Sequence, residues 1–247
     1  YSAIVVDEAQ DFGMRAFKLL RTLVDEGKND LFIVGDAHQR IYGHKVVLGQ
    51  CEINVRGRSK KLKLNYRTTD EIRKWAVALF NGENIDDLDE GTDSNRDYKS
   101  LYNGPKPEVK NFETFDEEVT YIHQYIENIK KTDNESKICL VVRTQKLVDV
   151  YSDYFSKSNM KTIKISRNSK DDLSNTDVRI ATMHRVKGLD FDHVIIASMN
   201  KGIVPLETIE KSDEDLINSE NLQKEKSLVC VAATRAKKSL LVTSYGI

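Results

Sequence analysis

Cysteine is scarce in this chain of 247 residues, which contains only Cys51, Cys139 and Cys230. The three lie far apart and form no CxxC pair, which excludes a disulfide framework and argues against a zinc knuckle. We therefore expect three buried thiols.

Long apolar runs and an excess of charge of either sign are also missing. No run approaches the ~18 to 20 apolar residues of a membrane span, and no basic leader or small-residue cleavage site is visible. Lys and Arg total 38 against 39 Asp and Glu, a formal charge of −1, so any contact with a polyanion requires a local patch. We expect a cytoplasmic protein that does not contact a membrane. Because Tyr1 opens directly into an apolar run, we also expect a piece of a longer protein.

Short β-rich runs alternate with helical stretches along the chain. This alternation predicts an α/β fold in which a parallel sheet is flanked by helices. The expected strands are residues 3–6, 31–34, 62–64, 138–142, 162–165, 178–181, 194–197 and 240–243.

Two helices between these strands have clear signals. Thr114 and Glu117 have the spacing of a capping box, and an apolar stripe of Phe115, Val119, Ile122, Ile126 and Ile129 follows at helical spacing. A second stripe, residues 147–155, precedes the strand at Thr162, and a third helix is expected over about 221–237.

Residues 81–107 are expected to form a loop because they are rich in Asp, Asn and Gly and hold two of the three prolines. Their carboxylates, Asp86, Asp87, Asp89 and Glu90, are expected to be solvated rather than to bind a metal.

Acidic and amide side chains follow the first two expected strands. Asp7 and Glu8 follow the first, and Asp36 and Gln39 follow the second. Ligands gather at the carboxyl ends of parallel strands, so the two acids could hold Mg²⁺ and activate a water, while Gln39 could orient that water. The acid pair could equally begin a helix as its N-cap, and both interpretations remain open.

Three cationic residues lie in turn-like contexts: Arg67, Lys187 before Gly188, and Arg235. Each alone is typical of a salt bridge or a surface position. Arginine is also suited to clamp phosphoryl oxygens, because its planar, always charged fork binds them bidentately.

Five ordered strings resemble motifs II to VI of the superfamily 1 DNA helicases of the UvrD, Rep and PcrA type. They are IVVDEAQD, FIVGDAHQRIY, LKLNYRT, IATMHRVKGLDFDHV and VAATRAKK, and they span nearly the whole chain. The resemblance implies a RecA-like P-loop NTPase fold. Residues 1–62 would be the C-terminal remnant of the first RecA-like domain and residues 63–247 the complete second one, with ATP between them.

The resemblance also implies ATP and Mg²⁺ as cofactors and assigns roles in hydrolysis. Asp7 would bind Mg²⁺, Glu8 would polarise the attacking water, and Gln39 would couple the γ-phosphate to the nucleic-acid site. Arg67 and Arg235 would act as arginine fingers. The remaining nucleotide contacts would be Tyr66 near the adenine, Lys187 and Gly188 near the phosphates, and Asp190 near the ribose.

Single-stranded nucleic acid, DNA rather than RNA, is the implied partner. Thr182, His184 and His44 would contact the strand, and Tyr42 would help to form a platform on which bases stack. The form of the motif around Thr182 resembles the class that moves 3′ to 5′.

The sequence departs from the family pattern at several positions. Gly43 and His44 stand where a tryptophan is usual, Asp190 replaces Glu, and Cys230 replaces an aromatic residue. Residues 67–182 leave no room for the bulky extra subdomain of larger members, so strong duplex unwinding is not expected.

The phosphate-binding pattern GxxxxGK[ST] is absent, since the only Gly-Lys pair, Gly27-Lys28, is followed by Asn29. We expect this piece alone not to hydrolyse ATP and the parent to carry the loop upstream. The alternative is a nonenzymatic helicase-like module that binds nucleic acid or a protein.

Two further features carry weaker signals. The five histidines show no metal-ligand spacing, and His123 is expected to face solvent. The densest basic stretch could bind phosphates or form a solvated hairpin, and both remain open; it contains Arg56, Arg58, Lys60, Lys61 and Lys63.

Overall fold

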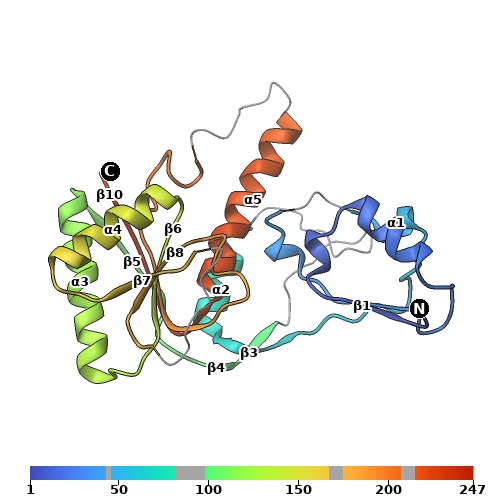
Figure 1. The fold of residues 1–247 in the computed structure, drawn as a ribbon, viewed down its shortest axis with the longest axis horizontal. Coiled ribbons are helices and arrows are strands. Elements are labelled where there is room, and N and C mark those ends of the chain that lie inside the picture. The colour runs from blue at the N-terminus through green and yellow to red at the C-terminus, as the bar shows by residue number, and fades with distance from the viewer. Residues whose placement is uncertain (43–45, 82–97, 167–174, 207–214, 247) are drawn as a thin grey trace. The chain divides into compact units, whose positions relative to one another are not determined.

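A computed structural model describes residues 1–42, 46–81, 98–166, 175–206 and 215–246 (Figure 1). Within these ranges the chain forms two compact units. Unit 1 comprises Tyr1–Lys63 and Phe80–Tyr98, and unit 2 comprises Leu64–Leu79 and Lys99–Ile247.

Unit 1 is built around two parallel strands, β1 (Ile4–Val6) and β2 (Leu31–Ile33). Helix α1 (Met14–Thr22) connects them, and the short 3₁₀ helices η1 (Ala9–Asp11), η2 (Ala37–Gln39) and η3 (Leu48–Cys51) follow β1, β2 and Tyr42 in turn. A core of Val6, Phe17, Leu48, Cys51 and Ile53 joins the sheet to α1 and η3.

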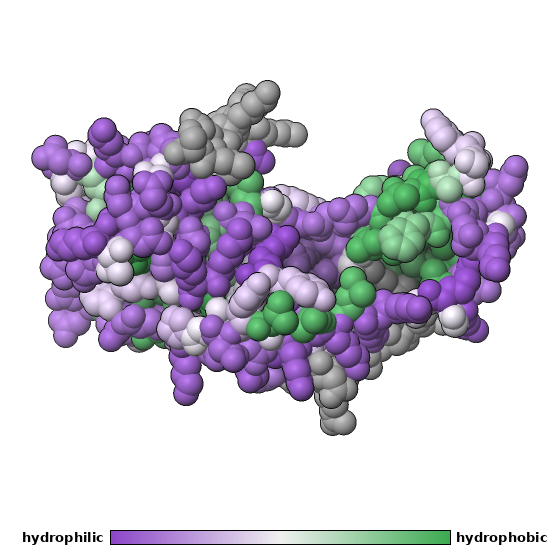
Figure 2. All heavy atoms as spheres, turned by 90° about the horizontal axis from the view of Figure 1, so that it is seen from below, coloured by the Kyte–Doolittle hydropathy of each residue, from purple (hydrophilic) through white to green (hydrophobic). Residues whose placement is uncertain are grey.

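The second face of this small sheet is apolar and exposed. Val5 and Phe32 are register partners on β1 and β2, and they are 73% and 65% exposed. Figure 2 shows apolar side chains gathered on the surface of unit 1.

Unit 2 contains a six-stranded parallel sheet in the order β5-β10-β9-β6-β8-β7. Its strands are β5 (Glu108–Phe112), β6 (Ile138–Val142), β7 (Thr162–Lys164), β8 (Val178–Thr182), β9 (Phe191–Ile196) and β10 (Ala236–Tyr245). A separate parallel pair, β3 (Leu64–Thr69) and β4 (Lys99–Tyr102), makes up a second sheet.

Helices cover both faces of the large sheet (Figure 1). Helices α3 (Phe115–Thr132) and α4 (Gln145–Lys157) lie on one face, and α2 (Asp70–Ala78) and α5 (Asp215–Ala233) on the other. All five residues of β6 are buried, as expected for a parallel strand enclosed on both sides. The α/β prediction is confirmed.

Local signals placed several elements correctly. The capping box of Thr114 and Glu117 is present in both directions at the start of α3. The three cysteines are buried and unbridged, as predicted. None of the helices in the described ranges is long and apolar enough to cross a membrane.

Other expectations were wrong in detail. The strand expected at 62–64 begins at Leu64 and continues to Thr69, and the helix expected over 221–237 spans Asp215–Ala233, because β10 already begins at Ala236. Strand β4 forms within the expected loop of 81–107, whose acidic residues Asp86, Asp87, Asp89 and Glu90 lie outside the described residues. His123 is half-buried, because its ring packs 6.2 Å from that of Phe155.

Candidate functional site

The carboxyl ends of β1 and β2 lie side by side in unit 1. The amide of Ala9 donates to the carbonyl of Val34 at 2.9 Å, and that of Val34 donates to Val6 at 2.9 Å. Because the strands are parallel, the residues after them, Asp7 and Asp36 among them, meet at one edge of the sheet.

A chain of hydrogen bonds connects Glu8 to Gln39 along this edge. Gln10 Nε2 donates to Glu8 Oε2 at 2.5 Å, and Gln10 Oε1 accepts from the amide of Asp36 at 2.9 Å. Gln39 Nε2 in turn donates to Asp36 Oδ2 at 2.8 Å. The predicted water-polarising acid and the predicted phosphate-coupling amide are thus linked through two intermediate residues.

Gln10 is the residue of this edge that the sequence reasoning missed. It is only 2% exposed, yet its side-chain oxygen and nitrogen both have partners. A buried amide that bridges two strand ends fixes the separation of those ends. The signal was its place directly after an acid pair at a strand end.

Glu8 occupies the N-cap position of the 3₁₀ helix η1, so the N-cap interpretation holds for its place in the chain but not for an α-helix or for a side-chain cap. Glu8 precedes η1 in the left-handed region (φ 52°, ψ 38°) and its side chain caps nothing, while α1 begins after Gly13. The Glu8 amide donates to Asp7 Oδ1 at 2.8 Å, and both side chains are exposed.

Asp7 fits a magnesium site that is shared with phosphates. The described residues contain no cluster of three or more potential metal-binding side chains, so the protein alone does not build a metal cage there. Magnesium commonly binds through one or two carboxylates together with the phosphates of a nucleotide. The exposed carboxylate of Asp7 at a strand end would supply the protein's share of such a site.

In unit 2, Asp190 gathers two cationic side chains at the start of β9. Its Oδ1 lies 3.1 Å from Arg67 Nε on β3, and its Oδ2 lies 3.7 Å from Lys237 Nζ on β10. The amide of Phe191 donates to the carbonyl of Arg235 at 3.0 Å. Three segments that are distant in sequence, each with a predicted nucleotide-binding residue, therefore meet here.

The other predicted nucleotide contacts of unit 2 differ in exposure. Tyr66 is exposed beside Arg67. Lys187 and Gly188 are the central residues of a turn closed by Leu189 N and Val186 O at 3.0 Å, and Gly188 takes the positive φ (82°) that a type II turn needs there.

Arg235 is only 2% exposed, and its guanidinium faces the end of α5. Nε donates to the carbonyl of Val231 at 3.0 Å, and Nη2 contacts Thr234 Oγ1 at 3.3 Å. Arg235 and the Thr234 hydroxyl thus both donate to the Val231 carbonyl near the end of α5. To contact a phosphate as predicted, this side chain would have to turn away from the helix.

Thr182 and His184 lie at the carboxyl ends of the strands of the large sheet, whereas Asp190 and Arg235 lie at the amino ends of β9 and β10. Thr182 ends β8, and the amide of Met183 donates to the carbonyl of Val142 at the end of β6. Burial, followed by the charge of nearby Arg143, lowers the pKa of His184 from its ordinary value of 6.5. His184 is therefore mainly neutral at pH 7.

Arg143 and Glu225 next to His184 were not predicted as site residues. Arg143 Nε and Nη2 donate to the two carboxylate oxygens of Glu225 at 2.9 and 2.6 Å, joining the end of β6 to α5. Both side chains are largely buried. Arg143 directly follows an apolar strand, so its position could have been recognised from the sequence, whereas its partner could not.

In unit 1, Tyr42 is 58% exposed, which leaves its ring accessible for stacking. His44 lies outside the described residues.

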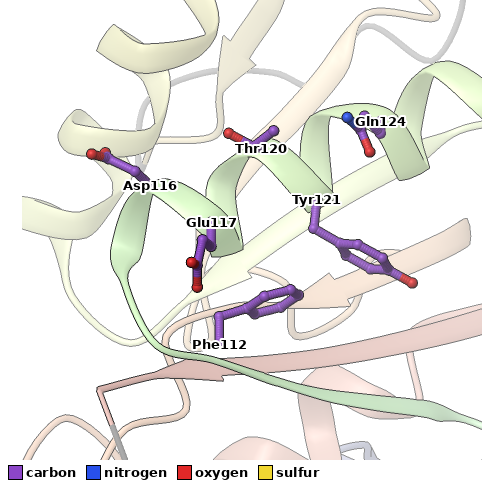
Figure 3. Close-up of a pocket in the computed structure, with 6 residues that line it drawn as sticks. All are labelled: Phe112, Asp116, Glu117, Thr120, Tyr121 and Gln124. Carbon is purple, nitrogen blue, oxygen red and sulfur yellow. The ribbon is translucent and has the colours of Figure 1, made fainter.

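A shallow hollow on unit 2 contains none of the predicted residues (Figure 3). It lies between α3 and β5, and its lining includes the packed rings of Phe112 and Tyr121. The Tyr121 hydroxyl donates to Glu108, and Glu117 accepts amide bonds in the capping box. The fold itself uses these polar groups.

The parallel sheet with helices on both faces, and with acids and arginines at strand ends, defines a RecA-like α/β fold. Comparison with known proteins agrees: residues 60–169 and 161–246 match the family model of the UvrD-like helicase C-terminal domain, and residues 1–47 match that of the UvrD/REP helicase N-terminal domain. The chain belongs to the UvrD-like helicase family.

Individual relatives are similar over different lengths. The chain is 22% identical over 260 residues to a probable DNA helicase of Mycoplasma pneumoniae, covering 99% of this chain and 44% of that protein. It is 39% identical over 66 residues to the ATP-dependent DNA helicase Rep of Buchnera aphidicola, covering 27% of this chain and 9% of Rep. It is 24% identical over 220 residues to one polypeptide of the ATP-dependent helicase/nuclease of Lactobacillus helveticus, covering 83% of this chain and 17% of that polypeptide. The chain thus spans less than half of each of these relatives.

A solved structure has the same fold. It is the C-terminal domain of a possible DNA helicase from Lactobacillus plantarum, with a TM-score of 0.51 and 15% identity, covering 73% of this chain and 88% of that one.

Proposed function

We propose that this chain is the C-terminal part, motifs II to VI, of an ATP-dependent helicase or translocase that moves 3′ to 5′ along single-stranded DNA in the cytoplasm. The observation that carries the proposal is the hydrogen-bonded path from Glu8 through Gln10 and Asp36 to Gln39. A path of this kind supports a site in which the acid that activates water and the amide that senses phosphate respond to each other.

In unit 1, Glu8 is the general base and Asp7 the magnesium ligand. Bound MgATP supplies a phosphoanhydride bond for water to cleave. Glu8 accepts a proton from that water at a carboxylate oxygen, and Gln10 holds the carboxylate in place by donating to Oε2. Gln39, through Asp36, relays the occupancy of the phosphate position to the same bridge.

In unit 2, cationic side chains face the nucleotide. Arg67 is oriented by its ion pair with Asp190 and stabilises negative charge on phosphoryl oxygens. Asp190 and Tyr66 hold the ribose and the adenine, Lys187 and Gly188 approach the phosphates, and Arg235 acts as the second arginine finger after leaving the end of α5.

The nucleic-acid strand is held by Thr182 and His184 in unit 2 and by Tyr42, with His44, in unit 1. Because the pKa of His184 is lowered, His184 contacts the strand as a neutral hydrogen-bonding group rather than as a cation. DNA is the favoured substrate because the relatives are named DNA helicases.

The 247 residues alone are not expected to hydrolyse ATP at an appreciable rate. Their sequence has no GxxxxGK[ST] loop, whose backbone amides and lysine cradle phosphates. We propose that an upstream part of a longer protein supplies this loop, which agrees with the greater length of the relatives.

The test is the ATPase activity of the longer protein with and without single-stranded DNA. Stimulation by the strand is expected, and Glu8→Gln should lower kcat roughly 10²- to 10⁴-fold, the range for losing a general base. Glu26→Gln, an exposed acid elsewhere in unit 1, is the matched control and should leave kcat unchanged. If the longer protein binds single strands but hydrolyses no ATP, the nonenzymatic module takes the place of the motor.

A further inference from the structure

Residues 53–63 of unit 1 contain the densest basic stretch of the sequence. They contain Arg56, Arg58, Lys60, Lys61 and Lys63 and no Asp or Glu, although the chain as a whole has a formal charge of −1. All five cationic side chains are exposed. Protein surfaces usually intersperse charges of both signs, so eleven residues with five cations and no acid call for an explanation.

The first residue of this segment, Ile53, is anchored in the fold. Ile53 is buried in the unit 1 core, and its amide donates to the carbonyl of Leu48 at 3.2 Å. A turn follows over residues 55–58, closed by Arg58 N and Val55 O at 2.9 Å, with Gly57 at a positive φ of 71°. The hairpin that the sequence left open is not formed, since residues 59–63 are irregular.

Arg58 has a structural task within this turn. Its Nε donates to the carbonyl of Asn54 at 3.0 Å, and its Nη2 donates to the same oxygen. The Asn54 side chain accepts from the amide of Arg56 at 3.1 Å. Arg58 thus holds the turn together; Arg56 lies within this turn, and the three lysines follow it.

We propose that Arg56, Lys60, Lys61 and Lys63 contact the sugar-phosphate backbone of the single strand on which the protein acts. This inference rests on the proposed function for the presence of the strand, and it adds contacts that, apart from Lys63, lie outside the five motif strings. Phosphate contacts come mainly from exposed Lys and Arg and carry no sequence information, so irregular backbone is sufficient to present them. A repeating anion can engage four cations spread along eight residues, whereas a single nucleotide offers one compact group of phosphates.

The experiment measures binding of labelled oligo-dT to the 247-residue chain by fluorescence anisotropy, at salt concentrations from about 50 to about 300 mM. Single-strand binding depends steeply on salt in this range. Each phosphate contact contributes a slope on the order of −0.7 to a plot of log K against log salt concentration. The test variant combines Arg56→Gln, Lys60→Gln and Lys61→Gln and keeps Arg58. The control combines Lys146→Gln, Lys157→Gln and Lys161→Gln, exposed lysines of unit 2, with the same change in net charge.

We expect the salt slope of the test variant to fall by about 2 and its affinity at 0.1 M salt to fall roughly 100-fold, as for three lost phosphate contacts. The same loss should occur with mixed-sequence strands, and the control should match the unmodified chain. Because the altered side chains are exposed, the thermal melt should not move.

Two results would overturn the proposal. If the test variant keeps the original slope, or if the control loses as much, residues 56–63 make no specific contact. A chain that binds no single strand at all counts against the proposed function itself, and this contact falls with it.

Discussion

Arg67 and Asp190 form an ion pair in unit 2, with Arg67 Nε 3.1 Å from Asp190 Oδ1. One comes from β3 and the other immediately precedes β9, so the pair joins the two sheets of the unit. The two residues that the resemblance assigns to the phosphates and the ribose therefore position each other.

Asp190→Asn should separate a functional role from a structural one. The pair is partly exposed, so its loss should cost less than about 1 kcal/mol of unfolding free energy, measured by urea denaturation. In the longer protein the KM for ATP should rise several-fold, as for one lost hydrogen bond of about 1 kcal/mol. Asp149→Asn removes the exposed ion pair with Lys164 and is the control. It should change the free energy of unfolding by as little as Asp190→Asn does and should leave the KM for ATP unchanged. A loss above about 3 kcal/mol, the size seen when a buried pair is broken, would make the Asp190 pair structural.

Gln10→Met should uncouple the two strand ends of unit 1. It removes the donor to Glu8 and the acceptor of the Asp36 amide, so kcat of the longer protein should fall by about 10-fold or more, because the base is no longer oriented. Added to Glu8→Gln, the same change should produce no further loss, since groups that act together are not additive. Additive losses in the double variant would contradict the coupling.

Glu118→Ala should strongly destabilise unit 2. The fully buried Glu118 carboxylate accepts from Thr243 Oγ1 at 2.6 Å, the Ser198 amide at 3.0 Å and the Tyr151 hydroxyl at 2.5 Å. Burial, with the nearby Glu118 charge, raises the pKa of Tyr151 well above 10, so its hydroxyl stays a donor.

The Thr243 hydroxyl and the Ser198 amide would lose this acceptor and Tyr151 would keep only Ser198 Oγ, so the free energy of unfolding should fall by about 3 to 5 kcal/mol in urea denaturation. Glu127→Ala, on the exposed face of α3, is the control and should cost under about 1 kcal/mol. A similar cost for both would mean that the network contributes nothing beyond helix propensity.

Asp70→Asn should show a loss that depends on pH. Desolvation raises the pKa of Asp70, but hydrogen bonds from Lys74 and Arg73 outweigh it and lower the pKa from 3.8 to about 2. A carboxyl with a depressed pKa stabilises the fold above its unfolded pKa, and this contribution disappears as pH falls through the folded value.

The difference in unfolding free energy between the unmodified chain and Asp70→Asn should be about 2 kcal/mol at pH 7 and shrink between about pH 4 and pH 2. Asp116→Asn, an exposed first-turn acid of α3, controls for the loss of a charge near a helix start. A difference independent of pH would show that the ion pairs of Asp70 are not its source.

Local sequence signals predicted the elements that depend on neighbours in the chain. Helix α3 was found because Thr114 and Glu117 lie three residues apart and the stripe behind them is periodic. Strand β5 was missed because it is an edge strand whose Val109, Lys110 and Asn111 are exposed, so it has no apolar run. Strand β4 was missed for another reason: it exists only by pairing with β3, across a long separation in sequence.

The residues of the candidate site also fall into those that local sequence predicts and those that depend on contacts between distant segments. Asp7 and Asp36 were found because each follows an apolar strand. The bridge by Gln10 and the pairing of Arg143 with Glu225 depend on which strand and helix ends meet in space. The burial of Arg235 could not be predicted either, because a motif reveals the residue type but not the rotamer.

The left-handed backbone of Glu8 carries a conformational cost that the contacts of its side chain must offset. Holding a non-glycine residue in this region costs roughly 1 to 2 kcal/mol of folding free energy. Glycine avoids that cost, but its greater conformational freedom in the unfolded chain costs about 0.5 to 1 kcal/mol on folding. Glycine at position 8 would relieve this strain, but it would carry no carboxylate and would leave the buried Gln10 Nε2 without the acceptor that Glu8 Oε2 provides. The strained glutamate therefore holds the strand ends through Gln10 and, under the proposed function, also supplies the base.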